Sequence, residues 1–207
     1  MKEIRLNFRF KTPYIIKSGF GYAGIFDDTM LRDGSGFLYI PGSSIKGRIR
    51  AHMQKLLRST GKSFCSDEIC KDRSHLCIMC RLFGSPFVAS PLVFTDSKHT
   101  DKQKKFFRAL IRKEEGFPFN LDTTGFASTP ITRKRLTALK GGLHITELPL
   151  EGLEFQSRII GDISDNDMKE LINAIRLITH LGGNKGRGVG RLTDDGIEVE
   201  VINEIKT

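Results

Sequence analysis

Four cysteines lie within sixteen residues of one another, with the spacing C-x4-C-x6-C-x2-C. Two close pairs separated by a short segment are typical of a tetrahedral zinc site with thiolate ligands. Because four ligands would fill the coordination shell, we expect a structural zinc that folds an insertion at residues 60–85. His75 could replace one cysteine, and four reduced thiols or a redox switch are the alternatives. The candidate ligands are Cys65, Cys70, Cys77 and Cys80.

A glycine-rich segment at 181–191 combines five glycines with three cations. Backbone amides and cationic side chains together are typical of phosphate binding. The segment follows an expected helix and precedes an expected strand, so it matches neither a P-loop nor a dinucleotide fingerprint. The alternative is a flexible turn. The candidate contacts are Gly183, Lys185, Gly186, Arg187, Gly188 and Arg191.

A second candidate phosphate site lies at 40–50, where small and hydroxyl residues precede a helix. The N-terminus of a helix attracts anions through its free amides and its dipole. The alternative is an ordinary capped helix with a solvated basic face. The candidate contacts are Ser43, Ser44, Lys46, Arg48 and Arg50.

Residues 98–140 carry eleven Lys or Arg and four Asp or Glu, a difference of +7. Phenylalanines are interleaved with these charges and could stack on unpaired bases. They are Phe106, Phe107, Phe117, Phe119 and Phe126. They could equally belong to the core, which we expect for Phe106 and Phe107.

Asp27, Asp28 and Asp33 lie in a glycine-rich loop at 17–36. Loop carboxylates in a basic protein can bind a divalent metal or move a proton, although such residues more often form turns. The sequence shows no Ser-His-Asp or Cys-His set. His52, His99, His144 and His180 are isolated in the sequence.

The elements that must position these residues follow from hydrophobic periodicity. Residues 3–10 alternate strictly between polar and apolar, which predicts a half-buried strand. We expect Ser43 or Ser44 to cap the first helix, and Ser164 or Asp165 to cap the second. The order strand–helix–strand occurs twice along the chain. This order predicts an α+β fold of the ferredoxin-like type with insertions. The expected elements are strands at 3–10, 91–96, 152–160 and 191–202, and helices from about 43 to 58 and from about 165 to 181.

The 207 residues suit a single domain, and the net charge of +9 favours a polyanionic partner such as nucleic acid. No apolar run approaches the roughly 20 residues of a membrane span. The first residues alternate between charged and apolar, unlike a secretory leader. We therefore expect a cytoplasmic protein with no membrane partner.

Taken together, these motifs resemble the RAMP (repeat-associated mysterious protein) superfamily of CRISPR systems, and most of all the backbone subunit of type III effector complexes. The resemblance extends over nearly the whole chain. It is carried by the helix start at 40–50, the glycine-rich segment at 181–191, the segment from Ile131 to Phe155, and the short sequence Arg81–Gly84.

The resemblance implies a modified ferredoxin-like (RRM-like) palm, with a thumb hairpin inserted within 97–150. Copies of such subunits stack along a guide RNA (crRNA), bind its backbone, meet the target RNA and contact other CRISPR effector subunits. Sequence is then read by base pairing, so the protein needs to contact only phosphates and 2′-hydroxyls. Contacts from the thumb would come from Arg133, Lys134 and Arg135.

In type III backbone subunits, an Asp in the loop before the Pro-Gly-Ser-Ser motif cuts target RNA with a divalent metal. Asp27 lies six residues before Asp33 and matches that position, and Asp28 is adjacent to it. The resemblance therefore implies Asp27 and Asp28 as catalytic candidates with Mg²⁺ or Mn²⁺. Residues 17–21 depart from the family's His-Gly-Gly, and no proline closely follows Asp27. The alternatives are an inactive structural subunit, or a stand-alone guide-processing ribonuclease that uses His52.

Overall fold

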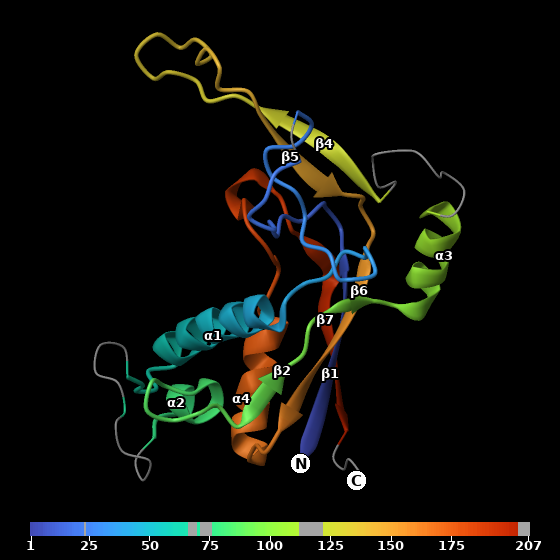
Figure 1. Cartoon of the computed structure of the whole chain (residues 1–207). Coiled ribbons are helices and arrows are strands. Elements are labelled where there is room, and N and C mark those ends of the chain that lie inside the picture. The colour runs from blue at the N-terminus through green and yellow to red at the C-terminus, as the bar shows by residue number, and fades with distance from the viewer. Residues whose placement is uncertain (23, 66–69, 71–75, 112–121, 203–207) are drawn as a thin grey trace.

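The computed structural model describes residues 1–22, 24–65, 70, 76–111 and 122–202. Its main sheet has the strand order β2-β6-β1-β7, and β3 also pairs with β6. A separate two-stranded sheet, β4–β5, projects from this body (Figure 1). The mixed architecture with antiparallel sheets confirms the predicted α+β class.

The strand β1 (Lys2–Phe10) occupies the centre of the main sheet. Its alternating sequence buries every second residue, from Ile4 to Phe10, against the helices. On its two sides it pairs antiparallel with β6 (Glu154–Gly161) and β7 (Leu192–Ile202). The edge beyond β6 is formed by β2 (Leu92–Phe94) and β3 (Lys98–His99). The four predicted strands are therefore neighbours in one sheet.

The helices α1 (Gly42–Ser59) and α4 (Asp165–Arg176) pack beside each other over one face of this sheet (Figure 1). Their apolar stripes are buried: Ile49 and Met53 of α1 and Leu171 and Ile175 of α4 are fully covered. A short helix, α2 (Ile78–Phe83), lies next to α1. The opposite face of the sheet carries charged and amide side chains, among them Arg5, Asn7, Gln156 and Arg158.

The start of α1 differs from the prediction. Pro41 is the N-cap residue and makes no side-chain cap hydrogen bond, so the expected cap by Ser43 or Ser44 is wrong. Instead Asp96 accepts a hydrogen bond of 2.8 Å from the amide of Gly42. Gly42 also lies so close to the carbonyl of Phe94 that a Cβ atom would stand 2.1 Å from its oxygen. Ser43 and Ser44 are left exposed in the first turn.

The predicted start of the second helix is confirmed, but the helix ends earlier than predicted. Ser164 caps α4 by accepting a hydrogen bond from the amide of Asp167. The helix ends at Arg176, although Ile178 and Leu181 remain buried. The apolar stripe therefore continues into a non-helical segment, which the periodicity alone could not separate from the helix.

Part of the segment that lacks clear periodicity is helical. The helix α3 (Asp101–Ile111) follows β3 directly. Phe107 is buried, as expected, whereas Phe106 is 59% exposed, so the expectation for Phe106 is wrong. The candidate stacking residues Phe117 and Phe119 lie outside the described residues.

The strands β4 (Thr123–Ser128) and β5 (His144–Pro149) pair antiparallel along their whole length. Residues 129–143 join them at the far end of the projection (Figure 1). Most of β4 is exposed, so its sequence lacks an alternating core pattern. Within the described part of the chain, no helix is long and apolar enough to cross a membrane.

Candidate nucleic-acid interface and catalytic loop

The loop that carries Asp27 and Asp28 runs alongside β5 of the projecting hairpin. The amide of Asp27 donates to the carbonyl of Ile145 at 2.8 Å, and the amide of Glu147 donates to the carbonyl of Asp28 at 2.9 Å. Asp28 also forms a parallel bridge with Thr146. The two aspartates are therefore held by backbone hydrogen bonds to a regular strand.

Buried charges fix the downstream part of this loop. One carboxylate oxygen of Glu147 accepts from the amide of Met30 at 2.7 Å, and the other accepts from Thr123 and Arg32. Arg32 also makes two hydrogen bonds of 2.9 Å to Asp122. Burial alone would raise the pKa of Glu147, but these donors outweigh it and lower that pKa. Glu147 thus remains ionised and anchors the loop to both hairpin strands.

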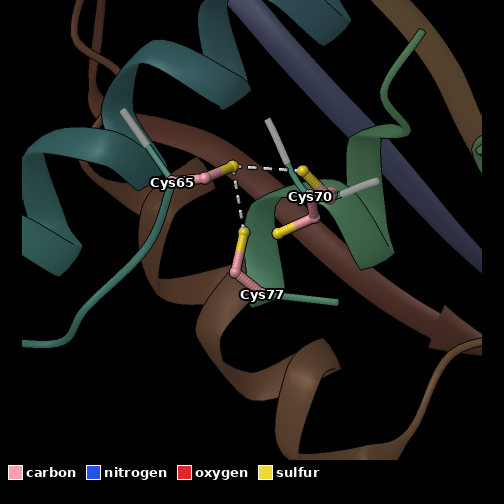
Figure 2. A group of neighbouring side chains, drawn as sticks. Cys65, Cys70 and Cys77 are labelled. Atoms are coloured by element: carbon pink, nitrogen blue, oxygen red, sulfur yellow. Dashed lines mark hydrogen bonds between the residues drawn. The ribbon is translucent and has the colours of Figure 1, made fainter. Parts of the chain in front are cut away.

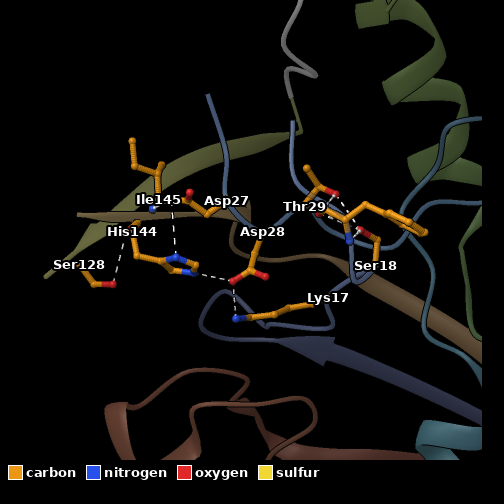
Figure 3. Close-up of polar contacts among 9 residues, drawn as sticks. Lys17, Ser18, Asp27, Asp28, Thr29, Ser128, His144 and Ile145 are labelled. Atoms are coloured by element: carbon orange, nitrogen blue, oxygen red, sulfur yellow. Dashed lines mark hydrogen bonds and ion pairs between the residues drawn. The ribbon is translucent and has the colours of Figure 1, made fainter. Parts of the chain in front are cut away.

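The carboxylate of Asp28 contacts two side chains, those of Lys17 and His144. Its Oδ2 atom pairs with Lys17 and lies 2.6 Å from Nε2 of His144 (Figure 3). The hydrogen bond from Lys17, and then that from His144, lower the pKa of Asp28. Its side chain is only 19% exposed. Asp28 is therefore an ionised carboxylate with its partners already in place.

Asp27 is the more open of the two carboxylates. Its Oδ2 atom accepts from the amide of Ile145 at 2.7 Å, and its side chain is 51% exposed. It lines a hollow of about 520 Å³ together with Phe26, Leu143 and Ile145. Asp27 is therefore the predicted catalytic residue that a ligand in this hollow can reach.

His144 is a residue of this site that sequence reasoning missed. It lies 116 positions from Asp28, and only the pairing of β5 with the loop brings them together. His52 is buried on α1, and its Nδ1 atom faces the carbonyl of Arg48. Burial lowers the pKa of His52. These observations do not favour His52 as a residue that acts on RNA.

The two predicted phosphate-binding segments lie side by side. Arg48 on α1 donates a hydrogen bond of 3.0 Å to the carbonyl of Gly182. Between α1 and the glycine-rich segment lies an open groove of about 390 Å³, lined by Ser44, Gly47 and Gly183 among others. A short 3₁₀ turn at Lys185–Arg187 exposes both cations. Sequence positions 44 and 183 thus contribute to one surface.

Some glycines of this segment are required by packing alone, so no ligand is needed to explain them. Gly190 has φ of +76°, and a Cβ atom there would stand 2.0 Å from the carbonyl oxygen of Leu181. Gly182 likewise lies against the carbonyl of Ile15. Gly186, by contrast, has open space around it and no positive φ. The number of glycines is therefore a weaker argument for phosphate binding than the sequence suggested.

The cations of α1 face two different hollows. Arg48 faces the groove beside the glycine-rich segment, whereas Lys46 and Arg50 line a second hollow of about 420 Å³ on another side of the helix. That second hollow also contains Cys65 and Cys80. The three predicted contacts on α1 are thus divided between two sides.

Arg133, Lys134 and Arg135 lie at the tip of the projecting hairpin and are exposed. The tip stands well away from α1 (Figure 1). It also exposes apolar side chains, with Ile131 at 65% and Leu136 at 80%. The tip therefore combines positive charge with exposed apolar surface, separately from the groove beside α1.

The four cysteines gather between α1 and α2, and their sulfur atoms all lie within 4.8 Å of one another. Figure 2 shows the sulfurs of Cys65, Cys70 and Cys77 turned toward a common centre. The Sγ atom of Cys65 lies 3.4 Å from that of Cys77 and 3.2 Å from that of Cys80.

These distances are too long for a disulfide bond, in which the two sulfurs are about 2 Å apart. They are close to the roughly 3.8 Å expected between two thiolates that bind the same tetrahedral zinc ion. Burial raises the pKa of Cys65 and Cys80, whereas at Cys77 hydrogen bonds from Cys65 and Cys80 outweigh burial and lower the pKa to about 6. The spacing of the four sulfurs fits a metal ion. His75 lies outside the described residues.

Comparison with known proteins places this fold in a family. A family model described as the RAMP superfamily matches residues 7–193. The chain belongs to the RAMP superfamily. The matched range contains the aspartate loop, the cysteine cluster, the start of α1 and the glycine-rich segment.

This RAMP chain is similar to a protein of Methanocaldococcus jannaschii named CRISPR system Cms endoribonuclease Csm3. The two are 27% identical over 181 residues, which cover 80% of this chain and 66% of that protein. The chain thus spans slightly less than two thirds of its relative's length. Its fold is also similar to a chain in the cryo-EM structure of the Type III-B Cmr-beta bound to cognate target RNA. There the TM-score is 0.64, with 15% identity, 96% of this chain and 97% of that chain covered.

Proposed function

We propose that this chain is a guide-RNA-binding backbone subunit of a type III CRISPR ribonucleoprotein and that it cleaves bound target RNA. Membership of the RAMP superfamily and similarity to a Csm3 endoribonuclease support the assignment. The observation that carries the cleavage proposal is the geometry of Asp27, a half-exposed carboxylate that lines an open hollow beside the hairpin.

Guide RNA would lie along the groove between α1 and the glycine-rich segment. The exposed cations Lys185 and Arg187 would contact phosphates, together with Arg191 and the hydroxyls of Ser43 and Ser44. Arg48 would contribute mainly by holding the segment through Gly182. Contacts of this kind position the RNA without reading its sequence.

The strand order β2-β6-β1-β7 supports the interpretation of the main body as a ferredoxin-like palm. The projecting β4–β5 hairpin would be its thumb, and Arg133, Lys134 and Arg135 at the tip would contact the guide–target duplex. Copies of the chain and other effector subunits would line up along the guide.

Cleavage would occur by attack of the target's own 2′-hydroxyl on the adjacent phosphate. A divalent Mg²⁺ or Mn²⁺ ion, when bound, would stabilise the charge that develops on the phosphate oxygens. Asp27 would hold the reacting group in the hollow through its open carboxylate oxygen. Asp28, which is already paired with Lys17 and His144, would orient its neighbours rather than reach the RNA.

The cysteine cluster would hold a structural zinc ion through Cys65, Cys70, Cys77 and Cys80. Zinc thiolate sites of this kind contribute directly to folding. The cluster packs against α1 and α2, so the metal would fix the helix that presents the guide-binding residues.

The second candidate function is an inactive structural subunit. It is favoured by the engagement of Asp28 with Lys17, which leaves a single open carboxylate. A guide-loaded complex assembled with this subunit separates the two functions. With Mg²⁺ and matched target RNA, we expect fragments that end in a 2′,3′-cyclic phosphate. Tight target binding without fragments would identify the structural subunit instead.

A further inference from the structure

His144, the first residue of β5, stands between the two carboxylates of the aspartate loop (Figure 3). Its Nε2 atom lies 2.6 Å from Asp28, and its Nδ1 atom lies 3.6 Å from Oδ2 of Asp27. The hydroxyl of Ser128 on β4 donates to the carbonyl of His144 at 3.4 Å and so ties its backbone to the neighbouring strand. The side chain is 43% exposed. The two ring nitrogens therefore have different environments. Nε2 is hydrogen-bonded to Asp28, whereas Nδ1 has no partner within hydrogen-bond distance among the described residues.

We propose that His144 is the general base of the cleavage site, with Nδ1 accepting the proton of the target's 2′-hydroxyl while Asp28 orients the ring through Nε2. This inference rests on the proposed function, because it assigns a role within the cleavage of target RNA.

Asp28 determines which nitrogen carries the proton. An ionised carboxylate can only accept a hydrogen bond, so the nitrogen that faces it must be Nε2–H. In the neutral ring, Nδ1 then has a free lone pair. Lys17 supports this arrangement by keeping Asp28 ionised. Among the described residues, the charged groups that contact the ring are Asp27 and Asp28. Lys17 pairs with Asp28, and the neutral Ser128 of β4 contacts the backbone of His144. A carboxylate–imidazole pair of this geometry is the arrangement that activates hydroxyl nucleophiles in hydrolases.

The separation of Nδ1 from Asp27 leaves a place for the nucleophile. At 3.6 Å the two atoms are beyond direct hydrogen-bond distance. A hydroxyl group set beside them can donate to Nδ1 and remain next to the open side of Asp27. Asp27 lines the open hollow, whereas His144 is not among its lining residues. RNA in the hollow would therefore reach Nδ1 of His144 from the side of Asp27.

The 2′-oxygen forms a bond to phosphorus as its proton moves to Nδ1 of His144, and the bond from phosphorus to the 5′-oxygen breaks. The departing 5′-oxygen takes a proton from solvent water, and the imidazolium later returns its proton to solvent. The products are a 2′,3′-cyclic phosphate and a 5′-hydroxyl, with no net uptake of protons.

The test compares the wild type with His144→Gln and His144→Ala in the guide-loaded complex. Single-turnover cleavage of matched target RNA is measured from about pH 5 to 8, the range in which histidine side chains change their charge. The amide of Gln can still donate a hydrogen bond to Asp28 but cannot take up a proton. We expect the wild-type rate to rise with pH. Both variants should be slower by about 100-fold or more, without that rise, while target binding stays unchanged. Added imidazole should restore part of the rate in His144→Ala.

Three outcomes would overturn the inference. If His144→Gln cleaves at nearly the wild-type rate while His144→Ala is slow, His144 only holds Asp28 in place. If both variants match the wild type, His144 has no part in the reaction. If the wild-type complex binds target but never cleaves it at any pH, the proposed cleavage function fails, and the role of His144 with it. The first two outcomes leave the proposed function intact, so the two failures are distinguishable.

Discussion

Arg32 and Glu147 lie 2.8 Å apart although 115 residues separate them in the chain. This ion pair joins the aspartate loop to β5, and both side chains are largely buried. Glu147 also accepts the amide of Met30. The position of Asp27 and Asp28 therefore depends on a contact between the loop and the base of the hairpin.

Replacement of Glu147 should weaken this anchor. Glu147→Gln keeps the volume of the side chain but removes the charge that faces Arg32, so we expect a loss of about 1–3 kcal/mol in the free energy of unfolding at pH 7. Chemical denaturation measures this loss. Glu198→Gln on the exposed face of β7 is the matched control, and an equal loss there would contradict the account.

The stabilisation by Glu147 should depend on pH in one direction. Because folding lowers the pKa of Glu147, its ionised form stabilises the protein above the unfolded value of about 4.3, and this contribution is lost as the pH falls through the lower folded value. The difference in stability between wild type and Glu147→Gln should therefore be full at pH 6 and shrink below about pH 4. A difference that stays constant down to pH 2 would show that the charge plays no role.

Two glycines of the 181–191 segment should respond differently to substitution. Gly190→Ala places a Cβ atom against the carbonyl of Leu181 at a positive φ, so we expect a loss of about 1–3 kcal/mol. Gly186→Ala meets open space and should leave the stability unchanged. Thermal unfolding of the two variants measures the contrast. Equal stabilities would mean that the backbone at Gly190 can relax, contrary to the packing seen.

The cysteine cluster should bind about one zinc ion per chain. Chelation should lower the melting temperature, and addition of Zn²⁺ but not Mg²⁺ should restore it, because thiolates prefer zinc. Cys70→Ser should reduce the zinc content measured by elemental analysis. Protein that holds no zinc and melts at the same temperature with chelator would refute the metal site.

The exposed cations of the glycine-rich segment should contribute to RNA affinity through phosphates. Arg187→Ala should weaken guide binding equally for different RNA sequences and reduce the slope of log affinity against log salt by about 1. Arg158→Ala removes the same charge from the open face of the main sheet. If the two variants reduce the slope equally, the groove beside α1 is not the binding surface.

The sequence predicts the main sheet and its two helices well because β1, α1 and α4 each bury one regular stripe of apolar residues. It also identifies the cysteine cluster, because all four ligands are close in the chain. It predicts the hairpin only through the family resemblance, since β4 is mostly exposed and lacks an apolar pattern. His144 and the Arg32–Glu147 pair could not be found from spacing, because the loop and β5 are distant in sequence and meet only in the fold.

The most direct test of the central claim is cleavage by a guide-loaded complex that contains Asp27→Ala. With Mg²⁺ and matched target RNA, we expect unchanged assembly and target binding and a loss of cleavage of about 100-fold or more. A parallel complex with Asp33→Ala controls for loss of a loop carboxylate away from the hollow. An undiminished set of fragments from the Asp27→Ala complex would contradict the assignment of this loop as the site of RNA cleavage.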